Sequence, residues 1–443
     1  MIKALALMGQ LGYGYNRDSF SRALDEGIDY IGVDAGSIDS GPYFLGSGCM
    51  KANYDSTRSD LEYPLVSAVK NGIPFIVGSA GYAGADAHLE QFMQIVKDIA
   101  SKNRLKIKVA VIHTELDKRA VVEFLRMGRI VSYESNPPLS EDDIEQSTRI
   151  VAQMGVGKII EALELGVDLV VAGRTTDASI YAAYPLLMGE DEAASWHMSK
   201  IIECGALCAR PASASDALLG WIEDKFFYLK PPNESRRCTP ESAMAHALYE
   251  NIDPYVIEEP DGTLFLNDCK YEQFDERTVR VTGARWVKRD RPTLKLEGAK
   301  LVGYRSIAVA GIRDPAMIRC LDDILDEVRA NRSLVPEGCT LRFRCYGRDG
   351  VLGDLEFDRT THEIGLIIDV VAPSQSQAHS ICSKVKSHLQ HYDYPNRVAT
   401  GANLAFPYSP AEIDAGAVYT FSVYHILEVE KPDELFRMEV IQL

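Results

Sequence analysis

The segment Val167–Ile180 joins an apolar run to a group of side chains that can bind an anion. Residues 169–172 are apolar, and Arg174, Thr175 and Asp177 follow within five positions. An apolar run of this length after a helix-like segment is typical of a buried parallel strand, and open sheets bind ligands at the carboxyl ends of such strands. An arginine can fork onto a carboxylate or phosphate, and Thr175 to Asp177 can cap the next helix. We therefore predict that Arg174, Thr175 and Asp177 bind a small anionic substrate.

Arg174 also has a structural interpretation. A buried arginine at a strand end must be paired, because an isolated charge is costly to remove from water. A salt bridge with Asp177 or Asp34 is therefore the alternative to substrate binding.

A glycine-rich turn follows the apolar run Pro74–Val77. It consists of Gly78, Ser79, Ala80 and Gly81. Such a turn can present backbone N–H groups to an anion, and these four residues are predicted to contact the substrate. The alternative is a tight turn that needs glycine torsions. Nucleotide binding is disfavoured, because the turn has neither the Gly-Lys-Ser/Thr of a phosphate loop nor a GxGxxG motif.

Three further candidates, Asp34, His113 and Glu134, each follow a short apolar run. Histidine titrates near neutral pH and a partly desolvated glutamate can do the same, so these residues are predicted to move a proton beside a carboxylate or thioester. Asp34 could instead hold a divalent cation, Mg²⁺ or Mn²⁺, because these ions prefer oxygen ligands. A histidine at a strand end is otherwise part of the hydrogen-bonded structure.

The elements that must position these residues alternate along the chain. Between the apolar runs lie helix-like segments at residues 19–26, 61–71, 86–101, 118–127 and 141–165. This alternation predicts an α/β fold with a parallel sheet and flanking helices, whose strands end at one edge. Asp34, Ser79, His113, Glu134 and Arg174 are then expected to line one cleft.

The pattern changes twice along the chain. Residues 1–190 are predicted to form the α/β domain with the strand-end site. Residues 191–312 contain short alternating runs and loops, which indicate a β-rich segment that completes the main domain. Residues 313–443 are predicted to form a small C-terminal α+β domain.

Composition excludes some classes of partner. The formal charge of −17 argues against nucleic acid and anionic membranes, which bind clustered Lys and Arg. No apolar run approaches the roughly 20 residues that span a bilayer. The nine cysteines show no CxxC pair, so neither a disulfide framework nor a zinc site is predicted. We expect a cytoplasmic homo-oligomer, and a small accessory subunit is a further candidate partner.

Several segments together resemble the acyclic terpene utilisation (AtuA) family. They are Asp34-Ala-Gly, Gly78-Ser-Ala-Gly, Asp168 to Ser179, His197 with Ile202-Glu-Cys-Gly-Ala, Ala245-His-Ala-Leu-Tyr-Glu and Val279 to Arg285, within residues 1–310. Family members usually continue the Glu-Cys-Gly segment into a Gly-Gly pair, whereas this chain continues through residues 206–211 without one. That departure indicates a different substrate.

The resemblance implies an α/β enzyme that acts in catabolism. Its preferred reaction is that of a lyase or hydratase on a small branched or polycarboxylic acid or its acyl-CoA thioester. The alternatives are a noncatalytic substrate-binding or scaffold subunit of a larger complex, and a hydrolase that uses Cys204 or Ser79 as its nucleophile. Cys204 is otherwise a small buried apolar residue.

Overall fold

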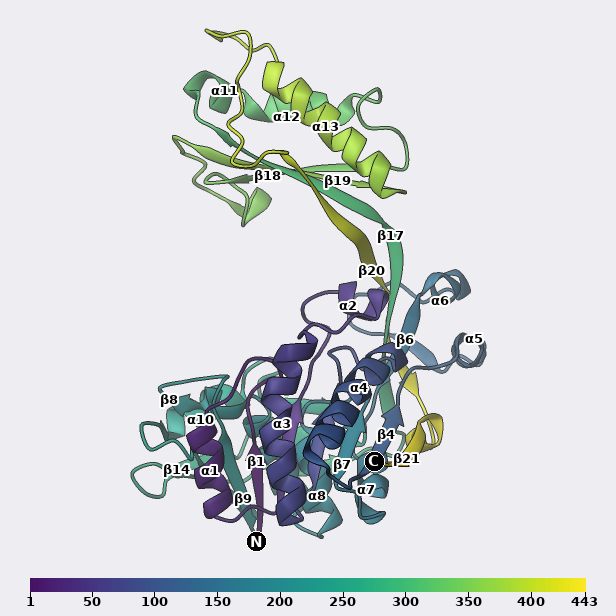
Figure 1. Cartoon of the computed structure of the whole chain (residues 1–443), viewed down its shortest axis with the longest axis vertical. Coiled ribbons are helices and arrows are strands. Elements are labelled where there is room, and N and C mark those ends of the chain that lie inside the picture. The colour runs from purple at the N-terminus through teal and green to yellow at the C-terminus, as the bar shows by residue number, and fades with distance from the viewer. The chain divides into compact units, whose positions relative to one another are not determined.

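The computed structural model describes residues 1–443, which form two compact units. Unit 1 comprises Met1–Lys300 with Phe421–Leu443, and unit 2 comprises Leu301–Thr420. The chain passes from unit 1 to unit 2 within strand β17 (Thr293–Ile312) and returns within β20 (Glu412–Glu428), as Figure 1 shows. Unit 2 is therefore an insertion in unit 1.

Unit 1 contains a sheet of ten strands with a parallel centre. The five parallel strands are, in spatial order, β1 (Ile2–Ala6), β2 (Tyr30–Asp34), β3 (Phe75–Gly78), β7 (Leu169–Ala172) and β4 (Lys108–His113). Beyond β1 the sheet continues with the antiparallel strands β9 (Leu218–Glu223), β10 (Phe226–Lys230), β15 (Val279–Thr282) and β14 (Lys270–Gln273). The last strand, β21 (Arg437–Gln442), pairs antiparallel with β4 at the other edge. The predicted α/β fold class is confirmed.

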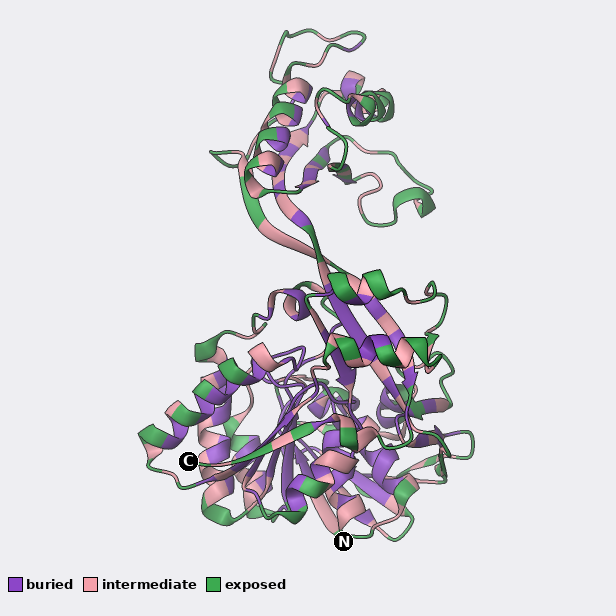
Figure 2. Cartoon of the chain, turned by 90° about the vertical axis from the view of Figure 1, so that its right-hand side faces the viewer, coloured by how far each residue is buried: buried purple, intermediate pink, exposed green.

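Helices cover both faces of this sheet, because its central strands are apolar on both sides. One face packs against α1 (Arg17–Asp25), α3 (Tyr54–Asn71) and α4 (Asp86–Asn103). The other face packs against α7 (Gly157–Glu164), α8 (Ser179–Leu187) and α9 (Glu192–Ile202). Figure 2 shows the sheet buried among helices whose outer surfaces are exposed. Alternate residues of each strand thus enter two separate cores.

Shorter elements complete unit 1. The helices are α2 (Tyr43–Ser47), α5 (Lys118–Arg126), α6 (Glu141–Gln146), α10 (Pro240–Ala247) and the 3₁₀ turns η1 (Gly205–Cys208) and η3 (Pro432–Leu435). Strands β8 (Ala209–Arg210) and β11 (Arg237–Cys238) form one small sheet, and β12 (Val256–Glu259), β13 (Gly262–Phe265) and β16 (Arg285–Lys288) form another. Strand β6 (Arg149–Gln153) pairs with the first part of β17.

Two predicted elements are wrong. The segment 141–165 is not one helix, because α6 ends at Gln146 and β6 lies between α6 and α7. The apolar run at 130–133 is not a strand of the parallel sheet: β5 (Ile130–Ser132) pairs antiparallel with β20. In both places pairing with a distant strand overrides the local pattern.

Unit 2 is an α+β layer. Strands β18 (Thr340–Tyr346) and β19 (Ile364–Ala372) lie beside the unit 2 portions of β17 and β20. Helices α11 (Pro315–Arg319), α12 (Leu321–Ala330) and α13 (Gln375–His391), with the turn η2 (Gly353–Leu355), complete the unit. Its core is apolar and includes Leu366, Ile368 and Val370 of β19 and Val385 of α13. None of the helices in either unit is both long and apolar enough to cross a membrane.

Candidate functional site

Polar side chains gather where β2, β3 and β7 end. Ser79 Oγ accepts hydrogen bonds from Arg174 Nη1 at 3.2 Å and from the Thr175 backbone N–H at 3.3 Å. Asp34 is buried and interacts electrostatically with Asp177 and Arg174. The structure therefore brings together five of the predicted residues, and all five come from neighbouring parallel strands.

Arg174 is paired with Glu297, a residue that the sequence analysis did not consider. Nε lies 2.8 Å from Glu297 Oε2 and Nη2 lies 3.3 Å from Oε1, so the guanidinium contacts both carboxylate oxygens. The two side chains are only 4% and 0% exposed. Asp177, one of the two predicted partners, lies farther away, at 3.7 Å from Nη1. Glu297 reaches this position because β17 pairs with β6, with Glu297 opposite Val151.

The glycine-rich turn between β3 and α4 has two of its amides occupied. The N–H of Ser79 donates to the carbonyl of Gly173 at 2.9 Å, and that of Ala80 donates to Ala172 at 3.0 Å. A side chain at Gly78 would overlap Thr175 Oγ1 and Ile180. The turn therefore holds β3 against the end of β7, and contact of residues 78–81 with a substrate stays a prediction.

Three buried carboxyl groups, those of Asp34, Glu203 and Glu259, lie in or beside this strand-end cluster together with the partly exposed carboxyl group of Asp177. Burial raises the pKa of Glu203, at the end of α9, to about 7, although the adjacent Lys200 opposes this shift. Burial likewise raises the pKa of Glu259, at the end of β12, to about 8. The pKa values of Asp34 and Asp177 are also raised, in both cases mainly by burial. Carboxyl groups that exchange protons near neutral pH are characteristic of general acid–base sites.

A cavity of about 260 Å³ opens beside these carboxyl groups. Its lining includes Thr176, Glu250, Glu259, Lys295 and Tyr133. Glu259 Oε2 is buried and has no hydrogen-bond partner, while a hydrogen bond with Thr176 lowers the pKa of the same carboxyl group against the effect of burial. Lys295 Nζ lies over the ring of Tyr424 at 4.6 Å from its centroid. The cavity thus combines a proton-holding carboxyl group, a hydroxyl group and a fixed cation.

His113 belongs to a different environment. By the alternation of side chains along β4, His113 lies on the same face of the sheet as Val109 and Val111, which pack in the core that contains α4. Its Nδ1 lies 2.7 Å from Asp86 Oδ1, at the first residue of that helix, and Nε2 is buried without a hydrogen-bond partner. Arg174 continues the series Val170 and Ala172, which packs in the opposite core. His113 and Arg174 therefore leave the sheet on opposite faces, and a proton-transfer role for His113 stays a prediction.

Glu134 does not lie at the end of a parallel strand, so the prediction that it shares that edge is wrong. It is exposed, has a left-handed backbone with φ of 52°, and follows β5. It lies beside Tyr133, whose pKa is raised mainly by burial and further by the Glu134 carboxylate. Its predicted catalytic role is not tested by this placement.

A divalent cation at Asp34 stays a prediction, because few possible ligands gather there. No three His, Cys, Asp or Glu side chains are grouped so that they could hold a metal ion. Asp34 instead accepts a hydrogen bond from the backbone of Gly36 and faces other carboxyl groups. We derive no catalytic step through a metal.

Neither predicted nucleophile forms a Ser–His or Cys–His pair. Ser79 accepts hydrogen bonds from Arg174 and Thr175, and no histidine hydrogen-bonds to it or to Cys204. Burial and the neighbouring Glu203 raise the pKa of the Cys204 thiol, which disfavours the reactive thiolate. The hydrolase interpretation thus gains no support from the geometry.

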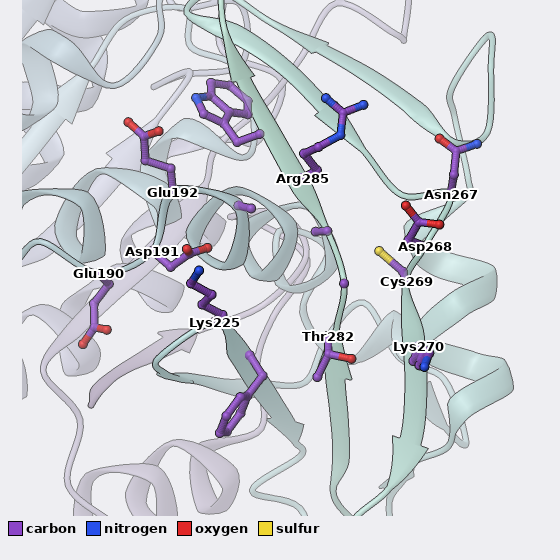
Figure 3. Close-up of a pocket in the computed structure, with 15 residues that line it drawn as sticks. Glu190, Asp191, Glu192, Lys225, Asn267, Asp268, Cys269, Lys270, Thr282 and Arg285 are labelled. Atoms are coloured by element: carbon purple, nitrogen blue, oxygen red, sulfur yellow. The ribbon is translucent and has the colours of Figure 1, made fainter.

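A larger hollow of unit 1 lies elsewhere. It measures about 1270 Å³ and is found where α9 begins, whereas Glu203 follows the last residue of that helix. Figure 3 shows Lys225, Asp268 and Arg285 around it, each from a separate segment. Its acidic and basic side chains are mixed, and none of the predicted site residues lines it. None of the predicted site residues lines the smaller cavity either, but that cavity contains Glu259, whose buried Oε2 has no hydrogen-bond partner, and it is therefore the candidate site.

The fold and these contacts define an α/β protein with desolvated charges at the carboxyl edge of a parallel sheet. The sequence matches the family described as acyclic terpene utilisation family protein AtuA over residues 47–215 and 224–406. The chain therefore belongs to this family, and its role is catabolic. No curated protein and no solved structure is significantly similar to it.

Proposed function

We propose that the protein is a lyase of the hydratase type, acting on a small branched or polycarboxylic acid or its acyl-CoA thioester. The observation that carries this proposal is Glu259, a buried carboxyl group with an unpartnered oxygen, in a cavity that also presents Lys295. Removal of water from a hydroxy acid needs an acid for the departing hydroxyl group and a base for the proton on the adjacent carbon.

Glu259 suits the role of the acid. With a pKa raised by burial to about 8, it is largely protonated at neutral pH and can give its proton to a hydroxyl group that leaves as water. In the reverse direction the ionised carboxylate takes that proton from an attacking water molecule. Glu250, an exposed carboxylate on the same cavity, is the available base for the carbon-bound proton.

Lys295 suits the role of the anion-binding group. It lies 3.5 Å from Glu297, which also holds Arg174, so its position is fixed by the buried ion pair. A cation here would neutralise a substrate carboxylate and stabilise the negative charge that develops when the adjacent carbon loses its proton. The cavity does not include His113 or Glu134 in its lining, so this mechanism assigns them no step.

The test is turnover by Glu259→Gln, measured with purified protein on hydroxylated and unsaturated branched and polycarboxylic acids and their CoA thioesters. Loss of the acid should lower kcat by roughly 10²–10⁴-fold with little change in substrate affinity. The matched control is Glu272→Gln, because Glu272 on β14 is an exposed glutamate of unit 1 that is paired with Arg280 and does not line the cavity.

Two outcomes contradict the proposal. If Glu259→Gln retains the wild-type rate on the best substrate, the carboxyl group is not the acid. If the wild-type protein binds such acids but turns none of them over, the noncatalytic binding subunit becomes the preferred function.

A further inference from the structure

Two arginines face each other on the small sheet formed by β8 and β11. Arg210 and Arg237 are directly opposite in the antiparallel register, and both are exposed. Neither guanidinium group has an ion-pair or hydrogen-bond partner within the protein. Like charges placed directly opposite each other destabilise a pair of strands. This position therefore carries an uncompensated positive charge in a protein whose formal charge is −17.

Two further arginines fix the surroundings of this pair. Arg236 Nε lies 2.8 Å from the buried carboxylate of Asp216. Arg277 donates to the carbonyl groups of Arg236, Pro231 and Asn233. These contacts hold the backbone around β11 without using Arg210 or Arg237.

All four arginines line one open pocket of about 510 Å³. Glu234 and Glu276 also line it, but both are exposed and neither lies within ion-pair distance of an arginine. The pocket thus has a rigid floor and two arginines free to bind an anion.

We propose that Arg210 and Arg237 bind a phosphate group. A phosphate monoester carries a charge of about −1.5 to −2 at neutral pH, which matches the two facing cations, whereas one carboxylate would leave a positive charge unbalanced. A guanidinium group can also donate two parallel hydrogen bonds to two oxygens of one phosphate group. Each of these charge-assisted hydrogen bonds is stronger than a hydrogen bond between neutral groups.

The location of the pocket indicates the source of the phosphate. The loop of residues 206–216 lies just beyond the carboxyl end of β1. Within the loop, the Ala206 N–H donates to the carbonyl of Asp216, and the N–H of Gly9, which follows β1, donates to the carbonyl of Ala214. Seven residues separate Arg210 from Glu203 of the candidate site, a span of at most about 25 Å. The phosphorylated end of a coenzyme A thioester could occupy the pocket while its acyl end reaches the cavity. This source rests on the proposed function, and free inorganic phosphate is the other source.

The experiment measures binding and needs no turnover, so its failure is distinguishable from failure of the proposed lyase activity. Isothermal titration calorimetry would compare coenzyme A, pantetheine and inorganic phosphate on the wild-type protein, Arg210→Ala, Arg237→Ala and Glu259→Gln. The control is Arg344→Ala, because Arg344 is an exposed arginine of unit 2 without an ion pair. We expect coenzyme A to bind and each pocket variant to weaken it about tenfold or more, since a charged hydrogen-bonding group is lost.

Each outcome of the titrations either supports or overturns phosphate binding by Arg210 and Arg237. Coenzyme A binding that is lost in both arginine variants, kept in Arg344→Ala and Glu259→Gln, and absent for pantetheine supports the thioester source. Equal binding of inorganic phosphate and coenzyme A, lost in the same variants, supports a phosphate site for free phosphate. No binding of either probe, or binding that the arginine variants do not weaken although circular dichroism shows them folded, overturns the proposal.

Discussion

The two compact units differ in where they keep charge. In unit 1 the pair Arg174–Glu297 is almost completely buried, at 4% and 0% exposure, next to further buried carboxyl groups. In unit 2 the core is apolar, and each ion pair keeps at least one partner partly exposed: Arg305–Asp369 is 38% and 12% exposed, and Arg348, at 8%, pairs with Asp322 at 62% and Asp349 at 17%. Desolvating charges is costly, and a fold does not need it, as unit 2 shows. The comparison teaches that burying such charges is not a requirement of folding, which supports the functional role proposed for the buried charges of unit 1.

The largest effect should come from breaking the buried pair. Glu297→Ala leaves the Arg174 guanidinium group buried without its main partner, and we expect a loss of about 3–5 kcal/mol in the free energy of unfolding. Urea denaturation followed by tryptophan fluorescence reports on unit 1, because Trp196, Trp221 and Trp286 all belong to it.

A double variant sharpens this result. Arg174→Met with Glu297→Leu removes both charges and keeps an apolar side chain at each position, so most of the lost stability should return. A double variant as unstable as Glu297→Ala would mean that shape and hydrogen bonding at this position, not charge balance, decide stability.

The next effect concerns pH. The pKa values of Glu203 and Glu259 are raised by burial to about 7 and about 8, above their ordinary value near 4.5. The folded protein therefore holds these protons more tightly than the unfolded chain does. Their contribution to stability is complete below about pH 4.5 and is lost as the pH rises toward 8, by a few kcal/mol in total.

Thermal unfolding between pH 5.5 and 8.5 would measure this loss. Glu259→Gln should flatten the dependence on pH, because the amide does not titrate, whereas the exposed control Glu272→Gln should follow the wild-type curve. Stability that rises through this window, or an unchanged slope in Glu259→Gln, would show that the carboxyl group is ionised in the folded protein.

The smallest effect should come from unit 2. Asp369→Asn breaks a pair whose arginine is more than a third exposed, and solvent screening limits such pairs to about 1 kcal/mol or less. Far-UV circular dichroism during urea denaturation would measure the change. A loss as large as that of Glu297→Ala would remove the distinction between the two units.

Much of the fold could be predicted from local patterns. The apolar runs ending at Asp34, Gly78 and Ala172 are strands of the parallel sheet, because each is bounded by helix-like segments and by turn residues. The run at 130–133 has the same composition, yet it pairs with β20. A strand's partner is set by long-range packing, and nothing within four residues specifies it.

The candidate site was only partly predictable. Asp34, Ser79 and Arg174 lie together, as predicted from strand ends that gather at one edge, but none of them lines the cavity beside Glu259, and their roles stay predictions. The side chain of His113 lies on the face of the sheet opposite to that of Arg174. The sequence does not predict this face, because β4 is apolar on both sides and lacks a period-two pattern. Glu259 precedes Pro260, and this pattern predicts a turn. Glu297 is a single acidic residue in a strand of alternating character. Only the tertiary structure therefore places these two residues near each other.

Strand β21 has a consequence for how the protein is made. His113 of β4 lies opposite Arg437, and the two positions are 324 residues apart. At translation rates of about 5–20 residues per second, the edge of β4 waits roughly 15–65 s for its partner to be synthesised. An unpaired strand edge can associate with other chains during that interval. The nascent protein therefore has a period of exposure on the ribosome in which a chaperone would be most effective.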